Sequence, residues 1–278
     1  MPSVRIFFRK LNTLYVQPKL ESPHHTKNQR GMAEDKRDIQ ISKALAYLLR
    51  HGAVKEGLAI DSDGYIPVPE LLAHNRLKSL HCTLPDVERV VANNNKKRFN
   101  LIFDHETALM CATQGHSIAA VAPTNDVLEK ITTIEQLPSQ LVHGTNLSSL
   151  QLILQSGQLQ RMRRNHIHLA QGVTGVDDSV VSGMRVSSMV HIYLNVKKLC
   201  DRLQLFKSLN GVYLTADNIP VDLFEKVVLI ENTKNRAEIA EVILLLENKG
   251  VPYLKTNREA QQSRSNPRAH DFSSARFK

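Results

Sequence analysis

The sequence lacks the features of a membrane protein and of a disulfide-stabilised protein. No apolar run approaches the roughly 20 residues that a bilayer-spanning helix needs, and the run 242–246 is bounded by glutamates. The three cysteines, Cys82, Cys111 and Cys200, are odd in number and far apart, which is untypical of a disulfide framework. We therefore expect a protein without a membrane partner that works in a reducing compartment.

Several familiar ligand-binding motifs are also missing. Residues 143–145 (His-Gly-Thr) match neither the three spaced glycines of a Rossmann turn nor the Gly-Lys-Ser/Thr of a P-loop. No Cys-x-x-Cys pair accompanies His166 and His168, so a zinc site would lack its further ligands. In residues 61–64 (Asp-Ser-Asp-Gly) the glycine comes too early for a calcium loop, and we expect a turn. The sequence therefore predicts no metal site.

Basic residues outnumber acidic ones by 36 to 27, which gives a formal net charge of +9 at pH 7. A surplus of this sign suits a polyanion such as RNA or an anionic surface. The surplus alone is weak evidence, because many cytosolic proteins are mildly basic. At 278 residues the chain is long enough for one large domain or two modest ones, each with its own core.

The N-terminal half is predicted to contain helices followed by a small β-element. Apolar residues at helical spacing predict a helix over 38–50, and a second helix is expected just after Pro69. Thr83, with an acid three residues later, resembles a capping box that opens a third helix. Short strands are expected at 65–68 and 99–103. This order suggests a winged-helix module of about 100 residues.

The C-terminal half is predicted to be richer in strands. Two helices are expected at 147–156 and 236–249, each ended by a glycine. The expected strands are 141–143, 166–169, 191–194, 212–214 and 227–230. The predicted fold class is thus α+β. The predicted divisions are an extension (1–34), a first lobe (35–112), a linker (113–138), a second lobe (139–254) and a tail (255–278).

Both ends of the chain differ in composition from the rest. In residues 1–31 the basic side chains of Arg5, Arg9 and Lys10 precede the first acid, which is typical of a mitochondrial presequence. A disordered extension explains the same pattern slightly better, and Met32 is an alternative start. The tail, 255–278, is polar and without periodicity, so we expect disorder. Its basic residues could add nonspecific affinity for RNA.

Arg50 and His51 close the first predicted helix. Alone, such a pair is best explained by an arginine stem lying along apolar surface and by a histidine that favours the helix C-terminus. Two further basic groups, in residues 96–98 and 161–164, change that balance. Arginines from three separate sites could converge on a phosphate, which arginine binds through paired hydrogen bonds without a metal.

Eight short tracts occur in an order that is specific as a set. They are 45–51 (Leu-Ala-Tyr-Leu-Leu-Arg-His), 61–65 with 71–72, 97–99 (Lys-Arg-Phe), 111–117 (Cys-Ala-Thr-Gln-Gly-His-Ser), 143–146 (His-Gly-Thr-Asn), 162–169 (Met-Arg-Arg-Asn-His-Ile-His-Leu), 182–185 (Ser-Gly-Met-Arg) and 210–214 (Asn-Gly-Val-Tyr-Leu). Together they resemble the tRNA 2′-phosphotransferase family, and most closely its fungal members. The resemblance covers roughly residues 35–250.

The resemblance implies two lobes, the first winged-helix-like and RNA-binding, the second similar to the NAD-binding core of ADP-ribosyltransferases. It implies an enzyme of the last step of tRNA splicing, which transfers the splice-junction 2′-phosphate of ligated tRNA to ADP-ribose. In this scheme the 2′-phosphate displaces nicotinamide from NAD, and the neighbouring ribose hydroxyl then attacks phosphorus. The products are 2′-OH tRNA, ADP-ribose 1″,2″-cyclic phosphate and nicotinamide.

The family's catalytic set falls on Arg50, His51, Arg98 and Arg164. The arginines would grip the 2′-phosphate and the charge of its transition state. His51 would contact the phosphate and carry a proton in the second step, because imidazole titrates near neutral pH. Arg185, in another family tract, ranks lower and would add positive charge to the cleft.

The same resemblance implies the other components of the reaction. The residues implied for binding NAD or lining its cleft are His143, Gly144, Thr145, Asn165, His166 and His168. The implied partners are NAD, which is consumed, and a tRNA with an internal 2′-phosphate. The expected protein is a monomer of the cytoplasm or nucleus, with a mitochondrial form if residues 1–31 act as a presequence.

Two other functions stay open. An ADP-ribosyltransferase on the same core would modify phosphorylated nucleic-acid ends or protein. Such enzymes commonly carry a catalytic glutamate late in the NAD-binding domain, and none is found in a comparable tract after residues 210–214. A winged-helix binding protein without catalysis would use the first lobe alone, and Arg164 would then be unnecessary.

Overall fold

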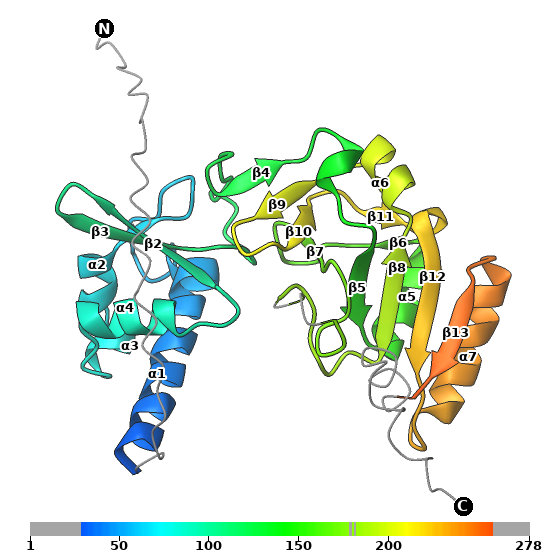
Figure 1. Ribbon diagram of the computed structural model, residues 1–278, viewed down its shortest axis with the longest axis horizontal. Helices are drawn as coiled ribbons and strands as arrows, with labels where there is room; N and C mark the ends of the chain where they lie inside the picture. The colour runs from blue at the N-terminus through cyan, green and yellow to red at the C-terminus, as the bar shows by residue number, and fades with distance from the viewer. Residues whose placement is uncertain (1–28, 178–179, 181, 258–278) are drawn as a thin grey trace, which may run out of the picture.

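The computed structural model describes residues 29–257 apart from 178–179 and 181, with side chains from residue 36 onward. Helices and strands are mixed along the chain (Figure 1), so the predicted α+β class is confirmed. The expectations for residues 1–28 and 258–278, which include most of the possible presequence and most of the polar tail, lie outside the described residues. In the described part, no helix combines the length and the apolar character that a bilayer span requires.

The helices are α1 (Gln29–Tyr47), α2 (Val68–Ala73), α3 (Asn75–Lys78), α4 (Leu84–Ala92), α5 (Leu147–Ser156), α6 (Val196–Arg202) and α7 (Arg236–Asn248). The strands are β1 (Ile66–Pro67), β2 (Phe99–Asp104), β3 (Thr107–Ala112), β4 (Leu128–Lys130), β5 (Leu141–Thr145), β6 (Gln158–Leu159), β7 (Ile167–Leu169), β8 (Val190–Leu194), β9 (Phe206–Ser208), β10 (Tyr213–Thr215), β11 (Ile219–Pro220), β12 (Phe224–Ile230) and β13 (Tyr253–Thr256). The sheets have the strand orders β1-β3-β2, β4-β9-β10-β7, β11-β6 and β13-β12-β8-β5.

The N-terminal part packs α1 to α4 with the sheet β1-β3-β2 around one core (Figure 1). The apolar stripe of the first helix forms its centre, and Ile41, Leu45, Leu48 and Leu49 are each 0% exposed. The predicted capping box is present at the start of α4, where the Asp86 carboxylate accepts hydrogen bonds from the backbone N–H and the hydroxyl of Thr83, both at 2.9 Å.

The first helix differs from its prediction at both ends. It begins at Gln29, so residues 29–34, which we expected to be disordered, are helical. At its other end, Leu48–Gly52 forms a π-helical turn, and the N–H of Ala53 donates to the carbonyl of Leu48 at 2.9 Å. Each hydrogen bond of a π-turn spans one residue more than in an α-helix, so the side chains on the turn point in different directions from those of a regular helix. Those side chains include Arg50 and His51.

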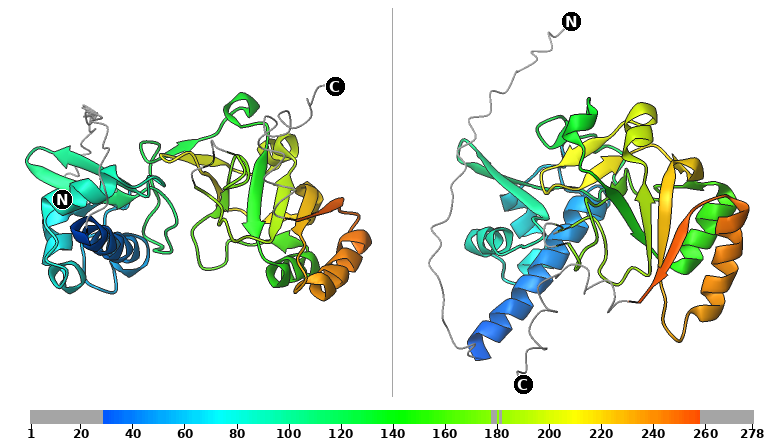
Figure 2. Two further views of the ribbon diagram at one scale, coloured as in Figure 1. Left: turned by 60° about the horizontal axis from the view of Figure 1, so that its bottom comes forward. Right: turned by 45° about the vertical axis from the view of Figure 1, so that its right-hand side comes forward.

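The C-terminal part is built on the sheet β13-β12-β8-β5, with α5 and α7 packed side by side against it (Figure 2). Leu150 of α5 and Val242 of α7 are buried with Ile192 and Leu229 of the sheet in one core. Among the described residues, the strand pairs of this part are antiparallel except β12 with β13, which α7 connects. A parallel pair needs such a crossover. The predictions of helices at 147–156 and 236–249 are confirmed within one residue.

Two predicted boundaries need correction. The segment 113–138 was expected to be a linker, but Leu128–Lys130 pairs with β9, and Ile118 and Val121 are buried in the N-terminal core. Each end of this segment therefore belongs to the part that it adjoins. Strand β13 continues to Thr256, inside the segment we expected to be a disordered tail. Its pairing with β12 supplies the order that local composition does not indicate.

Candidate functional site

Arg50 lies on the π-helical turn with its side chain largely buried against the segment that follows β3. Gly115 faces it, and a Cβ at that glycine would lie 3.6 Å from the Cδ and Nε atoms of Arg50. The Nε and Nη2 atoms of Arg50 are buried and have no hydrogen-bond partner among the described residues. Unmet hydrogen bonds of a buried charged group are costly, so these N–H groups are well suited to an anion.

Three arginines that are far apart in sequence lie close enough for their charges to interact. The pKa of Arg50 is lowered to about 10, first by burial and then by Arg98 and Arg164. The pKa of the exposed His51 is also lowered, by partial burial of its ring, by Arg50 and by Arg164. The structure therefore brings the four residues predicted for catalysis into one positive cluster.

His51 is held by the segment after β3. Its Nδ1 atom lies 2.8 Å from the hydroxyl oxygen of Ser117. The backbone N–H of Ser117 also donates to the carbonyl of Arg50 at 2.9 Å. Ser117 thus fixes both the backbone and the imidazole of the predicted catalytic pair. It belongs to the tract 111–117, so its presence in a family tract was the available signal for it.

Arg98 is presented at the start of β2. A tight turn precedes it, in which the N–H of Lys97 donates to the carbonyl of Asn94 at 2.7 Å and Lys97 has a φ of +43°. Arg98 donates from Nη1 to the side-chain oxygen of Asn94 at 3.2 Å, and its carbonyl accepts from Thr113 at 3.0 Å. Both ends of this residue are therefore tied to its own half of the molecule.

Arg164 closes a turn just before β7. Arg161 donates from Nη1 to the Arg164 carbonyl, and the Arg164 N–H donates to the Arg161 carbonyl, both at 3.1 Å. The Nη1 atom of Arg164 lies 3.5 Å from Nδ1 of His168. Burial and the neighbouring Arg185 lower the pKa of Arg164.

Three of the residues predicted to line the NAD cleft, His143, His166 and His168, form a histidine group next to Arg164. The Nδ1 atom of His143 lies 3.0 Å from the carbonyl oxygen of His168, which can only accept, so His143 carries its proton on Nδ1. Burial, Arg164, His143 and His166 lower the pKa of His168 to about 3. Its Nε2 atom is buried and lacks a hydrogen-bond partner within the described part of the chain. His168 is therefore neutral at pH 7.

Gly144 and Thr145 continue β5 past His143. A Cβ at Gly144 would lie 2.0 Å from Cγ of Met184 and 2.8 Å from the hydroxyl oxygen of Ser188, so only glycine fits there. The next helix, α5, is capped by Asn146, whose side-chain oxygen accepts from the N–H of Ser149 at 2.8 Å. Asn146 is therefore the N-cap of α5.

Asn165 uses its amide differently from the expected contact with NAD. Its Nδ2 atom donates to the carbonyls of Ile118 and Val121, at 2.9 and 3.1 Å, and its backbone N–H donates to the carbonyl of His116 at 2.9 Å. All three acceptors lie in the segment between β3 and β4. Asn165 therefore ties the C-terminal part of the molecule to the N-terminal part.

Two residues that sequence reasoning did not single out also lie between the two parts. Asn210 donates from Nδ2 to the carbonyl of Lys96 at 3.1 Å. His116 is buried, and burial, Arg50, His166 and His51 lower its pKa to about 4. Both belong to family tracts, but nothing in the pattern distinguished them from their neighbours.

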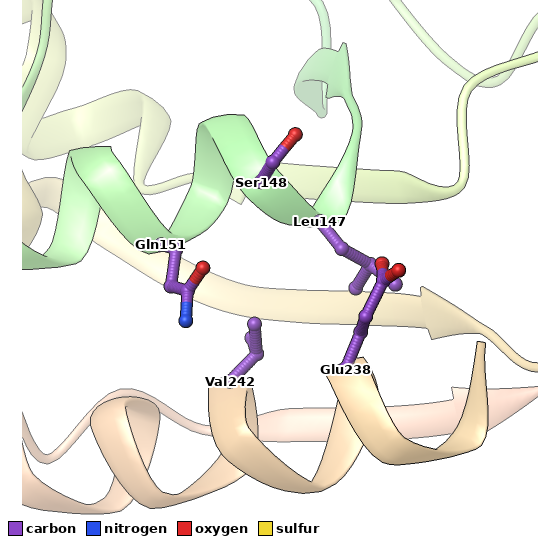
Figure 3. A pocket seen from close by; sticks show the side chains of 5 residues that line it. All are labelled: Leu147, Ser148, Gln151, Glu238 and Val242. Carbon is purple, nitrogen blue, oxygen red and sulfur yellow. The ribbon is translucent and has the colours of Figure 1, made fainter.

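A pocket of about 300 Å³ lies elsewhere, between α5 and α7 (Figure 3). It is lined by Leu147, Ser148, Gln151, Glu238 and Val242. None of the residues predicted for catalysis or NAD binding lines it. Within residues 29–257, apart from the gaps at 178–179 and 181, no group of three or more His, Cys, Asp and Glu side chains is arranged to hold a metal.

Comparison with known proteins gives a consistent result. A sequence model described as RNA 2′-phosphotransferase, Tpt1 / KptA family, matches residues 36–217. The chain is 46% identical to the tRNA 2′-phosphotransferase of Saccharomyces cerevisiae over 227 residues, which are 81% of this chain and 98% of that protein. It is 43% identical to tRNA 2′-phosphotransferase 1 of Danio rerio over 186 residues (66% and 80%), and 40% identical to tRNA 2′-phosphotransferase 1 of Homo sapiens over 188 residues (66% and 72%).

Proposed function

The chain belongs to the RNA 2′-phosphotransferase, Tpt1 / KptA family, and from that membership we propose that it removes the splice-junction 2′-phosphate of ligated tRNA in the last step of tRNA splicing. The phosphate is transferred to ADP-ribose derived from NAD. The products are 2′-OH tRNA, ADP-ribose 1″,2″-cyclic phosphate and nicotinamide.

The observation that carries this proposal is the state of Arg50. Two nitrogen atoms of its guanidinium, Nε and Nη2, are buried without a hydrogen-bond partner in the described residues, and two further arginines lie close enough to lower its pKa. Like charges in a partly buried site repel one another, so this arrangement is unfavourable unless an anion joins them. A phosphate with two negative charges and several acceptor oxygens matches it.

The arginines and His51 divide the work in the proposed reaction. Arg50, Arg98 and Arg164 bind the 2′-phosphate and stabilise the charge that builds up around phosphorus. His51, which Ser117 holds by its Nδ1 atom, presents its other ring nitrogen to the phosphate or to the hydroxyl that attacks it. Its lowered pKa keeps a large neutral fraction at pH 7, as a proton acceptor requires.

The histidine group is compatible with NAD as the second substrate. The Nε2 atom of His168 is buried and unpaired in the described chain, and Nδ1 faces the Arg164 guanidinium, so Nε2 carries the proton and donates. His143 has its proton on Nδ1, which leaves Nε2 as an acceptor. Such a donor and acceptor suit the oxygens and hydroxyls of a ribose. NAD would supply the ADP-ribosyl group that receives the phosphate.

The two parts of the molecule fit two different tasks. We assign residues 35–112 to a winged-helix-like RNA-binding lobe and 139–254 to an NAD-binding lobe that resembles ADP-ribosyltransferases. The arrangement of helices with a three-stranded sheet supports the first assignment, and His143 on β5 together with His168 on β7 supports the second. The segment between them contributes to both.

The test is a product analysis. The protein is incubated with NAD and an RNA that carries one internal 2′-phosphate, and we expect ADP-ribose 1″,2″-cyclic phosphate and nicotinamide to be released in equal amounts. Arg98→Ala should lower the rate by roughly 10²–10³-fold, the loss typical of one donor to a transition-state anion. Arg202→Ala is the matched control. It removes an arginine of an exposed ion pair with Asp222 that includes none of the predicted site residues, and it should retain full activity.

The other outcomes identify the competing functions. A stable ADP-ribosyl adduct on the RNA or on protein would identify an ADP-ribosyltransferase. RNA binding without consumption of NAD would indicate a binding protein. Full activity of Arg98→Ala would refute the assigned phosphate site while leaving the reaction itself intact.

A further inference from the structure

Asn165 joins the chain next to Arg164 to the opposite half of the molecule. It follows Arg164 directly, and its three hydrogen bonds all cross to the segment between β3 and β4. One of these bonds is from the backbone and would form with any residue except proline. The other two come from the side-chain NH₂ group and require a primary amide.

The acceptor segment holds the other half of the site. Asn165 binds the carbonyls of His116 and Ile118, and the residue between them is Ser117. Ser117 donates to the Arg50 carbonyl and contacts the His51 imidazole. Peptide bonds and hydrogen bonds together therefore connect Arg164, through Asn165 and the segment 116–118, to the Arg50–His51 pair.

The acceptors also define which side chain is needed at this position. Both side-chain bonds end on backbone carbonyl oxygens, which accept and never donate. An aspartate has the shape of asparagine, but it would place a carboxylate oxygen against two carbonyl oxygens. It would therefore repel them instead of binding them.

We propose that Asn165 is a positioning residue that sets the separation between Arg164 and the Arg50–His51 pair, an inference that rests on the proposed phosphotransfer. Its Nδ2 bonds to Ile118 and Val121 align the two halves so that arginines from both reach one phosphate. Misplacement of a reacting group by about 1 Å can cost about 100-fold in rate. The expected defect is thus in kcat, since both Nδ2 bonds of Asn165 are used on backbone carbonyls of the opposite half.

A second amide provides the matched control. Asn210 also joins the two parts, through one bond to the carbonyl of Lys96. It does not adjoin any of the four predicted catalytic residues in sequence, and it belongs to the loop between β9 and β10. If contact between the parts were all that mattered, removing either amide would have similar effects.

The experiment compares Asn165→Ala, Asn165→Asp and Asn210→Ala with the unmodified chain. We expect both Asn165 variants to lose about 100-fold in kcat, with KM for NAD changed less than threefold, whereas Asn210→Ala loses less than tenfold. In the Arg164→Ala background, Asn165→Ala should cause little further loss, because it acts through Arg164. A raised KM for NAD with an unchanged kcat would overturn the proposal and would make Asn165 a cofactor ligand.

A second measurement does not depend on turnover. Spin labels on the half-exposed Cys200 and on Glu106→Cys, at the tip of the β2–β3 hairpin, report the distance between the two parts. The distance distribution should broaden in both Asn165 variants at a temperature where their circular dichroism is unchanged. An unaltered distribution would refute the positioning role. Broadening in a protein that never turns over NAD would instead refute the proposed function and leave the positioning role standing.

Discussion

At the scale of single residues, Arg50 shows how function and stability oppose each other in this molecule. Its guanidinium is enclosed by Gly115 and by the π-helical turn, yet two of its N–H atoms have no protein partner in the described residues. An ion that is buried without a partner destabilises the fold. The arrangement makes sense when the missing partner is the substrate.

The first prediction concerns the substitution Arg50→Met, which keeps the length of the side chain and removes its charge. We expect activity to fall by at least 10²-fold, while the free energy of unfolding rises by about 1–3 kcal/mol, the usual penalty of unmet buried polar groups. Thermal and urea denaturation measure the second effect. Arg37→Met is the control, because Arg37 binds both carboxylate oxygens of Asp86, at 2.7 and 2.8 Å, and its loss should destabilise the protein. A less stable Arg50→Met protein would contradict the argument.

Individual residues were predictable only to the extent that their neighbours in sequence revealed them. The Arg50–His51 pair at a helix end has an unremarkable explanation by itself, and the other basic groups and the family tracts raised it above that. Asn165 could not be separated from His166 and His168, because one sequence does not say which side chain of a tract points toward the ligand. The unusual state of Arg50 is a property of contacts with Gly115 and with residues far along the chain.

At the scale of elements, prediction succeeded where local chemistry is sufficient. Helix α5 has an apolar face and an asparagine N-cap, and it ends at Gly157, whose backbone is in the left-handed conformation with a φ of +75°. The missed elements lack such signals. Helix α6 buries only Leu199, and β6 and β11 have two residues each, so neither shows a period. The strand β4 has only one buried residue, Leu128, and it is ordered by pairing with β9.

The second prediction concerns β5, where Met184 lies against Gly144. The substitution Gly144→Ala should lower the free energy of unfolding by about 1–3 kcal/mol, because its Cβ overlaps the Met184 side chain and the core is already full. Met184→Ala also destabilises by itself, through a cavity. In the double variant the Cβ introduced at position 144 partly fills the cavity that Met184→Ala leaves, so the overlap and the cavity are both reduced. The loss of stability should therefore be smaller than the sum of the two single losses. Simple additivity in urea denaturation would show that the two residues are not in contact.

At the scale of the whole molecule, the candidate site exists only where the two parts meet. The sequence placed Arg50 and Arg98 in one half and Arg164 in the other, but it carried no information on the distance between them. In our proposal that distance depends on the hydrogen bonds of Asn165, whose partners are backbone carbonyls and leave no trace in composition. This is why the residue types of the site were predictable and its geometry was not.

The third prediction concerns the histidines buried where the parts meet. His168 and His116 have pKa values lowered from 6.5 to about 3 and about 4, chiefly by burial and then by the arginines. Each stays neutral in the folded protein at pH values where the unfolded chain binds a proton. Their contribution to stability is complete above pH 6.5 and is lost as the pH falls toward 4 and 3. Between pH 7 and 5, each should lower the free energy of unfolding by about 2 kcal/mol.

Urea denaturation at pH 7, 6 and 5 measures this loss, and the variants His168→Gln and His116→Gln assign it. Glutamine is polar and does not titrate, so each variant should be less sensitive to acid than the original chain by about the amount given above. Leu150→Ala provides the control, because Leu150 is fully buried and does not titrate; it should lower the free energy of unfolding by the same amount at all three pH values. If the acid sensitivity persisted in both buried-histidine variants, the two rings would have to be accessible to protons in the folded state. Water would then screen the arginine charges near these rings more strongly than the lowered pKa of Arg50 indicates. The phosphate site would accordingly be more open to water than we propose.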